Sequence, residues 1–136
     1  MRQKYPDKHV KLVCGSYFDV EFGMQDFDAV VSFQTMHHFS HSPKKRLYGR
    51  IRYALGARGS SIECDYMVAD PEVEDGLHAK SAKIRSELGI ADGEFCHLDT
   101  PCTVNNQIAM FKGAGLASAE NVFRVGNTTI VVAKKD

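Results

Sequence analysis

The sequence is poor in the features on which several protein classes depend. It carries no net charge, because 17 lysines and arginines balance 17 aspartates and glutamates. This balance argues against a protein that binds nucleic acid through a strongly basic surface. No stretch approaches the roughly 20 apolar residues of a membrane span. Residues 1–10 show no apolar run behind their charges, so no signal peptide is expected. We therefore expect a cytoplasmic chain without nucleic-acid or membrane partners.

Cysteine is also scarce. The four cysteines form no C-x-x-C pair, are too few for a disulfide scaffold, and are spaced unlike any zinc finger. Cys14 and Cys64 lie inside apolar runs, which predicts buried thiols in a reducing compartment.

What is present indicates one globular domain. The 136 residues are 43% hydrophobic and 25% charged, which is close to the globular average. A chain of this length buries roughly 70% of its unfolded surface, enough for a core. No repeat, low-complexity segment or linker divides it.

The first half of the chain alternates strand and helix patterns. The β-branched segment His9–Cys14 predicts a strand that ends at Gly15. The apolar run Phe27–Phe33 is typical of a central strand in a parallel sheet. Ser42 and Pro43 then predict the start of a helix, which Gly56 or Gly59 ends. A further strand is expected over Ser61–Val68.

The second half adds two helices and a hairpin. A helix is predicted over His78–Leu88, with Ala79, Ala82 and Ile84 facing inward. Thr103 is the expected N-cap of a helix over Val104–Gly113. Two β-rich runs, 121–125 and 128–134, flank Gly126-Asn127 and predict a hairpin. The order of elements predicts an α/β fold, mainly parallel, with an antiparallel C-terminal hairpin.

Several segments in this order resemble one family. They are KLVCGSYFD, FDAVVSFQTMHHF, LGARGSSIECDY and NNQIAMFKGAGL, followed by the hairpin. Together they resemble the later half of the class I S-adenosylmethionine-dependent methyltransferases, strands three to seven, over Val10–Lys135. An aspartate at the start of strand four followed by an H-H-F turn is typical of the small-molecule branch. Gly59 and Ala114-Gly115-Leu116 fall where the family has glycines before strands five and six.

The sequence lacks the family's cofactor loop. No G-x-G-x-G motif occurs in the chain, and the acidic residue of strand two is missing with its strand. Ser16 stands where the family usually has an aspartate near the adenine. The resemblance therefore implies an incomplete Rossmann-like sheet: one truncated domain, 1–136, with a helical insert at 70–97. It also implies that the chain alone binds S-adenosylmethionine weakly or not at all.

The resemblance assigns roles to residues at the carboxyl ends of the strands, where open α/β sheets bind ligands. His37 and His38 are the candidate catalytic bases. Cofactor contacts are implied for Ser16, Tyr17, Ser32, Phe33 and Gln34, and substrate contacts for Thr35, His41, Asp65 and Tyr66. Ordinary alternatives stay open at this stage: histidines that cap a turn, and an aspartate that ends a strand in solvent. His37 and His41 have the spacing of a metal pair, but no third ligand is evident, so no metal site is predicted.

The missing strands predict an exposed edge. The family's sheet order is 3-2-1-4-5-7-6, so strand four, Val30–Phe33 here, loses its neighbour. Either the strand at His9–Cys14 moves over to pair with it, or a second copy covers the edge as a homodimer.

Two functions follow. The first is methyl transfer from S-adenosylmethionine to a small molecule, with the insert covering the acceptor pocket. The second is a non-catalytic, self-associating remnant, or one half of a split methyltransferase.

Overall fold

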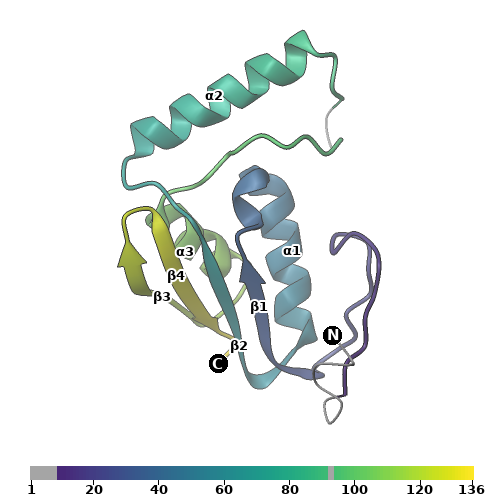
Figure 1. Cartoon of the computed structure of the whole chain (residues 1–136). Coiled ribbons are helices and arrows are strands. Elements are labelled where there is room, and N and C mark those ends of the chain that lie inside the picture. Colours follow the sequence, from purple (N-terminus) through teal and green to yellow (C-terminus); the bar gives the residue numbers. More distant parts are fainter. Residues whose placement is uncertain (1–8, 92–93) are drawn as a thin grey trace.

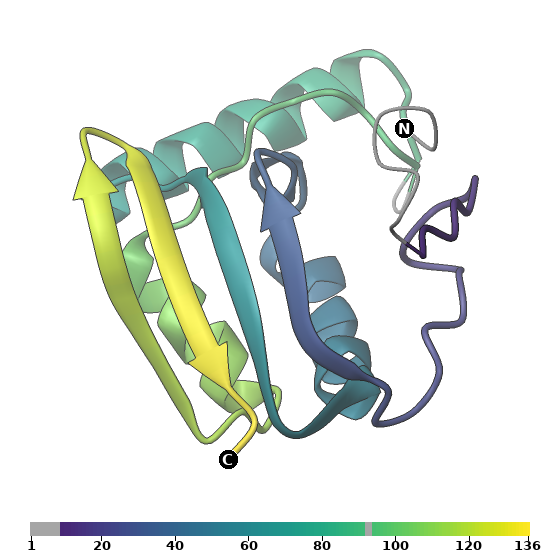
Figure 2. The same cartoon turned by 60° about the horizontal axis from the view of Figure 1, so that its bottom comes forward.

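The computed structural model describes residues 9–91 and 94–136. It contains a four-stranded sheet with strand order β1-β2-β4-β3 (Figure 1). The helices α1 and α3 both cover the same face of this sheet (Figure 2). The elements are β1 Phe27–Phe33, the 3-10 helix η1 Met36–His38, α1 His41–Ala54, β2 Leu55–Tyr66, α2 Pro71–Glu87, α3 Val104–Gly113, β3 Ser118–Val125 and β4 Thr128–Lys134.

The sheet is mixed. β1 and β2 are parallel, whereas β4 runs antiparallel to both of its neighbours, β2 and β3. The α/β class and the C-terminal hairpin are confirmed, but the expectation of a mainly parallel sheet is wrong. The reason lies in the hairpin, because its second strand inserts between β2 and β3 and makes both of its pairings antiparallel.

The N-terminal segment does not form the expected strand. Residues 9–14 have no strand geometry, and β1 pairs with β2 alone within the described sheet. The following residues pack beside α1, where the Arg50 guanidinium donates hydrogen bonds to the carbonyls of Tyr17, Phe18 and Val20. The alternative in which this segment closes the edge of β1 is therefore wrong. Cys14 is exposed, contrary to expectation, and Cys64 is only partly buried.

The starts of α1 and β2 differ from the predicted ones. α1 begins at His41 with Ser40 as N-cap, ahead of the predicted cap Ser42. β2 follows α1 directly and begins six residues before the predicted start at Ser61. Gly59 permits this early pairing, because a Cβ there would lie 2.9 Å from the Phe27 carbonyl oxygen.

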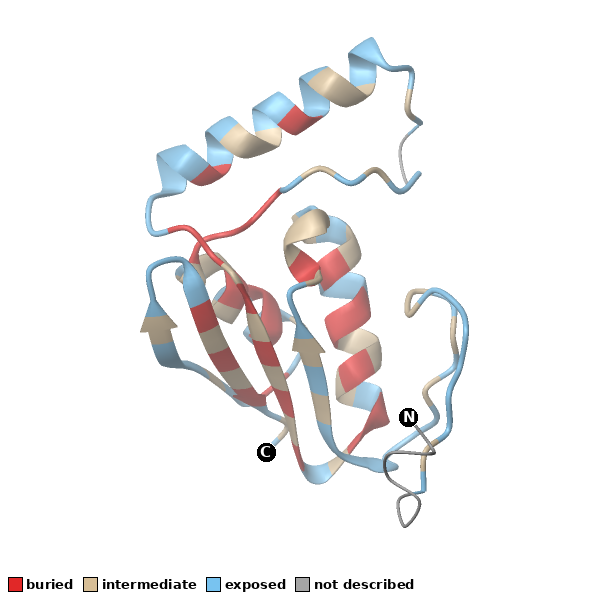
Figure 3. Ribbon diagram, in the orientation of Figure 1, coloured by how far each residue is buried: buried red, intermediate tan, exposed pale blue. Residues whose placement is uncertain are grey.

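The core lies between the sheet and the pair α1 and α3. The Phe111 and Val131 side chains are fully buried there, together with Leu47, Tyr48, Ile51, Leu55, Met110 and Ala133. Burial alternates along β2 and β4, as Figure 3 shows, so every second residue faces this core.

The opposite sheet face is apolar and open among the described residues. One row across it runs Val31, Ile62 and Val132, and the next runs Phe33, Cys64 and Ile130. Val31 is 67% exposed and Phe33 is 70% exposed. The edge strand β1 thus carries the least covered part of this face.

The helix α2 lies apart from the sheet, beyond the carboxyl ends of β1 and β2 (Figure 1). It is longer than predicted, because Asp70 caps it by accepting a hydrogen bond from the Glu72 amide at 2.9 Å. Its buried residues are the polar Glu74 and Ser81, whereas Ala79 and Ala82, predicted to face inward, are exposed. None of the described helices is long and apolar enough to cross a membrane.

Candidate active site

The candidate site lies where β1 and β2 end side by side. After Phe33 the chain turns through Gln34, whose φ of 49° is left-handed. The Gln34 amide still donates to the Cys64 carbonyl at 2.9 Å, which anchors the turn to β2. This sharp turn directs η1 across the end of the neighbouring strand.

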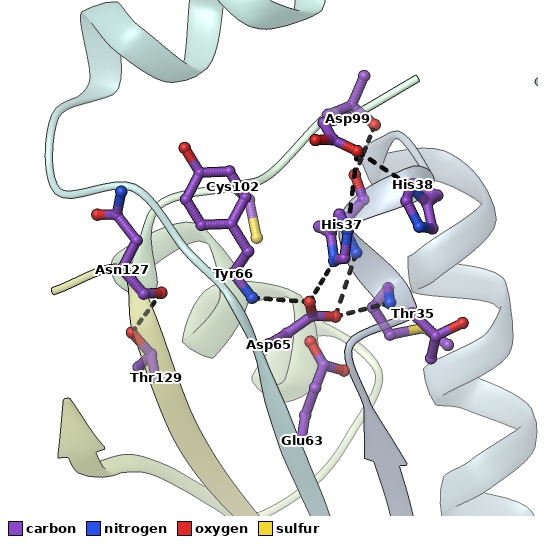
Figure 4. Close-up of polar contacts among 12 residues, drawn as sticks. Thr35, His37, His38, Glu63, Asp65, Tyr66, Asp99, Cys102, Asn127 and Thr129 are labelled. Carbon is purple, nitrogen blue, oxygen red and sulfur yellow. Dashed lines mark hydrogen bonds and ion pairs between the residues drawn. The ribbon is translucent and has the colours of Figure 1, made fainter. Parts of the chain in front are cut away.

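Asp65, near the end of β2, holds η1 in place (Figure 4). Its Oδ2 atom accepts hydrogen bonds from the amides of Met36 at 2.6 Å and His37 at 3.2 Å. Its Oδ1 atom lies 2.5 Å from Nδ1 of the His37 ring and accepts the Tyr66 amide at 2.7 Å. The carboxylate is 2% exposed, so it is buried but fully bonded. We call this arrangement the His37–Asp65 pair.

The pair fixes the chemistry of His37. A carboxylate beside Nδ1 keeps the proton on that nitrogen and leaves the lone pair on Nε2. Nε2 faces the rim, where the Asp99 carboxylate lies 3.7 Å away. Since Asp99 is 56% exposed and Asp65 is 2% exposed, Nε2 faces the more open side of the site. The arrangement can take a proton at Nε2 while Asp65 stabilises the resulting imidazolium.

His38 has a different role. Its ring packs between His37 and His97, with centroid separations of 4.0 and 4.2 Å. Burial, followed by the charges of His37 and His97, lowers the pKa of His38. Its Nδ1 lies 3.2 Å from Asp99. His38 therefore supports the rim around His37.

Two further predicted residues, Thr35 and Tyr66, lie beside this site. The Tyr17 hydroxyl and the Thr35 hydroxyl are 2.9 Å apart, and burial raises the pKa of Tyr17. The Tyr66 ring lies edge-on to His37, with centroids 6.1 Å apart. The structure thus brings Thr35, Asp65 and Tyr66 together with His37.

The residues implied for the cofactor have varied surroundings. The Ser16 hydroxyl accepts the Phe18 amide at 3.2 Å within its own turn, and Tyr17 is occupied by Thr35. Ser32 lies on the half-buried side of β1, whereas Phe33 lies on the open sheet face. The Ser16 and Tyr17 hydroxyls thus already have hydrogen-bond partners within the chain.

His41 lies in a separate cluster. Its contacts run to α2, with Nε2 2.5 Å from Glu74 Oε1 and its ring 5.1 Å from the His78 ring. It is therefore not grouped with the His37–Asp65 pair.

A buried polar network lies in the core around Glu63, two residues before Asp65 on β2. The Tyr48 hydroxyl donates to Glu63 at 2.8 Å and accepts from Gln107 at 2.7 Å. Gln107 in turn accepts from the Cys102 thiol, 3.1 Å away. Burial raises the pKa of Glu63 to about 7. Sequence reasoning missed this network, although a glutamate on the core side of a strand is itself an unusual signal.

Sequence reasoning also missed the contribution of the segment that follows α2 and carries His97 and Asp99. Neither Asp99 nor His97 was among the candidate residues identified from the sequence. The Thr100 amide donates to the His37 carbonyl at 2.6 Å, which places this segment over η1. The histidine and the aspartate of CHLDT, two residues apart, were the available signal.

A cavity of about 340 Å³ lies elsewhere, between α1 and α3. Its lining includes His41, Lys45, Asn106 and Met110, but neither member of the His37–Asp65 pair. The chemistry and this cavity are therefore separate, and the pair opens on the rim of the sheet instead.

Comparisons with known proteins show which proteins this chain is similar to. The sequence model of a family described as "Methyltransferase domain" matches residues 1–62. A Nostoc punctiforme protein described as a "putative O-methyltransferase" superposes with a TM-score of 0.64 at 25% identity, over 90% of this chain and 35% of its own. No match to a curated protein was found.

Two solved structures with known small ligands share the fold. One is a family 2 O-methyltransferase of Planctomyces limnophilus in complex with apigenin, with a TM-score of 0.64 at 12% identity over 90% of this chain and 33% of its own. The other is human N-acetylserotonin methyltransferase in complex with S-adenosylmethionine, with a TM-score of 0.62 at 12% identity over 89% and 32%. The chain thus spans about a third of the length of these proteins.

Proposed function

Since the chain belongs to the class I S-adenosylmethionine-dependent methyltransferases and carries a portion of their domain, we propose that it supplies the acceptor side of an O-methyltransferase. The substrate class is a small molecule with an acidic hydroxyl, such as a phenol. The observation that carries this proposal is the His37–Asp65 pair at the carboxyl ends of β1 and β2.

The pair provides the proton acceptor that a hydroxyl needs. In this family S-adenosylmethionine supplies an electrophilic methyl group. A hydroxyl hydrogen-bonded to Nε2 of His37 would pass its proton to the ring, and the oxygen would become the nucleophile. Asp65, already bonded to Nδ1, would stabilise the positive ring. General-base catalysis of this kind contributes about 10²- to 10⁴-fold to a rate.

The rim residues would orient the acceptor. Tyr66 offers a ring beside His37, and Asp99 offers a second acceptor near Nε2. The segment over η1 that carries Asp99 comes from the predicted insert at 70–97 and the residues after it, so we assign the insert to covering the acceptor.

Cofactor binding is the part that this chain does not supply in our proposal. The sequence has no glycine-rich loop, and the Ser16 and Tyr17 hydroxyls are hydrogen-bonded within the chain. In this proposal a partner segment with that loop completes the enzyme. The open apolar sheet face beside β1 supports this split arrangement, and it equally supports the second candidate, a self-associating chain without catalysis.

A methyl-transfer assay tests the proposal. The chain is mixed with a separate polypeptide that carries the glycine-rich loop of a class I methyltransferase, and labelled methyl groups are followed into small phenols. We expect His37→Gln to lower the rate by about 10²-fold or more. His9→Gln, an exposed histidine outside the site, is the matched control and should have no effect. Equal rates for wild type and His37→Gln would contradict the base.

A further inference from the structure

The cluster around His41 has the composition of a metal site. His41 begins α1, and Glu74 and His78 lie one turn apart on α2. Two imidazoles and a carboxylate are the ligand set of several zinc sites. One ligand atom from each residue lies within 4.8 Å of the other two. A residue pair four apart on a helix presents both side chains to the same ion.

The nitrogens in this cluster are unsatisfied. Nε2 of His78 and Nε2 of His41 are both buried from solvent and have no hydrogen-bond partner. The His41 nitrogen lies 2.5 Å from Glu74 Oε1 but is not aligned as a hydrogen bond. Buried polar atoms without partners are uncommon, and an ion is one of the groups that resolves them.

The carboxylate is held in place by the protein. Glu74 Oε2 accepts the Thr103 amide at 2.6 Å and the Asn106 side chain at 2.9 Å, and Asn106 also lies 3.0 Å from Oε1. A carboxylate oriented in this way by neighbouring donors is the usual support of a metal ligand.

We propose that His41, Glu74 and His78 bind one Zn²⁺ ion, which fastens α2 to α1 and to the start of α3. Zinc ligands lie about 2.0–2.2 Å from the ion, so tetrahedral ligand atoms are separated by about 3.3–3.6 Å. His41, at 36% side-chain exposure on the first residue of its helix, can open its contact with Glu74 to this separation. A water molecule would complete the fourth position.

The position of α2 shows what the ion would do. This helix buries only Glu74 and Ser81 and has no apolar seam against the sheet. Its hydrogen bonds to the start of α3 come from Glu74. An ion bound by residues from both helices would replace the missing apolar contacts.

Zinc titration of the full chain, after treatment with a chelator, tests the site. We expect one Zn²⁺ per chain and a raised melting temperature, because the ion binds the folded state. His78→Ala and His41→Ala should each weaken binding by at least about tenfold. His9→Ala should bind as wild type does. Circular dichroism of the chelated variants checks that they fold.

Two further readouts separate this site from the His37–Asp65 pair. Co²⁺ in place of zinc should give visible ligand-field absorption that His78→Ala abolishes and His38→Ala retains. Zinc should also slow hydrogen exchange in α2. The proposal is overturned if zinc does not bind, if His78→Ala binds it equally well, or if His38→Ala is the variant that loses it.

Discussion

The Asp65 carboxylate contacts His37 at two points, the ring Nδ1 at 2.5 Å and the backbone amide at 3.2 Å. It also accepts the amides of Met36 and Tyr66. One buried side chain at the end of β2 thus fixes both the position of η1 and the orientation of the imidazole. Structure and proposed chemistry depend on the same group.

Replacing that carboxylate by an amide separates the two roles. Asp65→Asn should lower the free energy of unfolding by about 1–3 kcal/mol. The backbone amides that donate to the charged carboxylate would lose one of its two acceptor oxygens, which becomes an NH₂ group. Nitrogen-15 NMR should show the His37 proton on Nδ1 in the wild type and shared between both nitrogens in the variant. Asp28→Asn, at an exposed position of β1, is the control. An unchanged tautomer in Asp65→Asn would contradict the arrangement.

Glu63 predicts how stability depends on pH. Burial raises its pKa from 4.5 to about 7. Between these values the folded chain keeps a proton that the unfolded chain releases, so stability falls as pH rises through this window. The contribution is fully present below pH 4.5 and is lost above about pH 7.

Urea unfolding of Glu63→Gln measures this contribution. From about pH 4.5 to about pH 8, the wild type should lose on the order of 3 kcal/mol more than the variant, whose amide does not titrate. Glu120→Gln, on the exposed side of β3, should follow the wild type. Parallel pH profiles for wild type and Glu63→Gln would show that folding does not shift the pKa of Glu63.

The sequence predicted the elements whose signals are local. β1, α3 and β4 have the predicted bounds, because a continuous apolar run, the Thr103 cap and the Gly126-Asn127 turn are each encoded within a few residues. The strand at His9–Cys14 was wrong for the opposite reason. Its β-branched residues have no neighbouring strand to pair with, so propensity alone did not form a strand.

The site was predicted in part. His37, Asp65 and Tyr66 follow from their places at strand ends. The contacts of Asp99, His97 and Glu74 depend on how the chain after α2 returns to the sheet. No local sequence pattern specifies that path. The same path separated His41 from His37 and gave it two partners from α2 instead.

The exposed β1 edge predicts association with a second copy. Val31 is 67% exposed on the open face, so Val31→Lys should leave the folded chain intact. A lysine at a buried position of a central strand would instead destabilise the fold. It should abolish a dimer, because two lysines would meet at the shared edge. Light scattering at micromolar concentration compares wild type, Val31→Lys and the control Val73→Lys on α2. A monomeric wild type would contradict the homodimer.

The missing glycine loop predicts weak cofactor binding. Calorimetric titration of the chain alone with S-adenosylmethionine should give no measurable heat of binding. A micromolar dissociation constant would contradict this expectation, and would show that Ser16, Tyr17 and Gln34 rearrange to form a cradle.

The most direct test of the account is an NMR titration of the chain with a small phenol and with its methyl ether. The account predicts shift changes centred on His37, Tyr66 and Asp99 with the phenol, weaker changes with the ether, and loss of the response in His37→Gln. Shift changes confined to the cavity between α1 and α3, lined by Lys45 and Met110, would contradict it, as would no response at all.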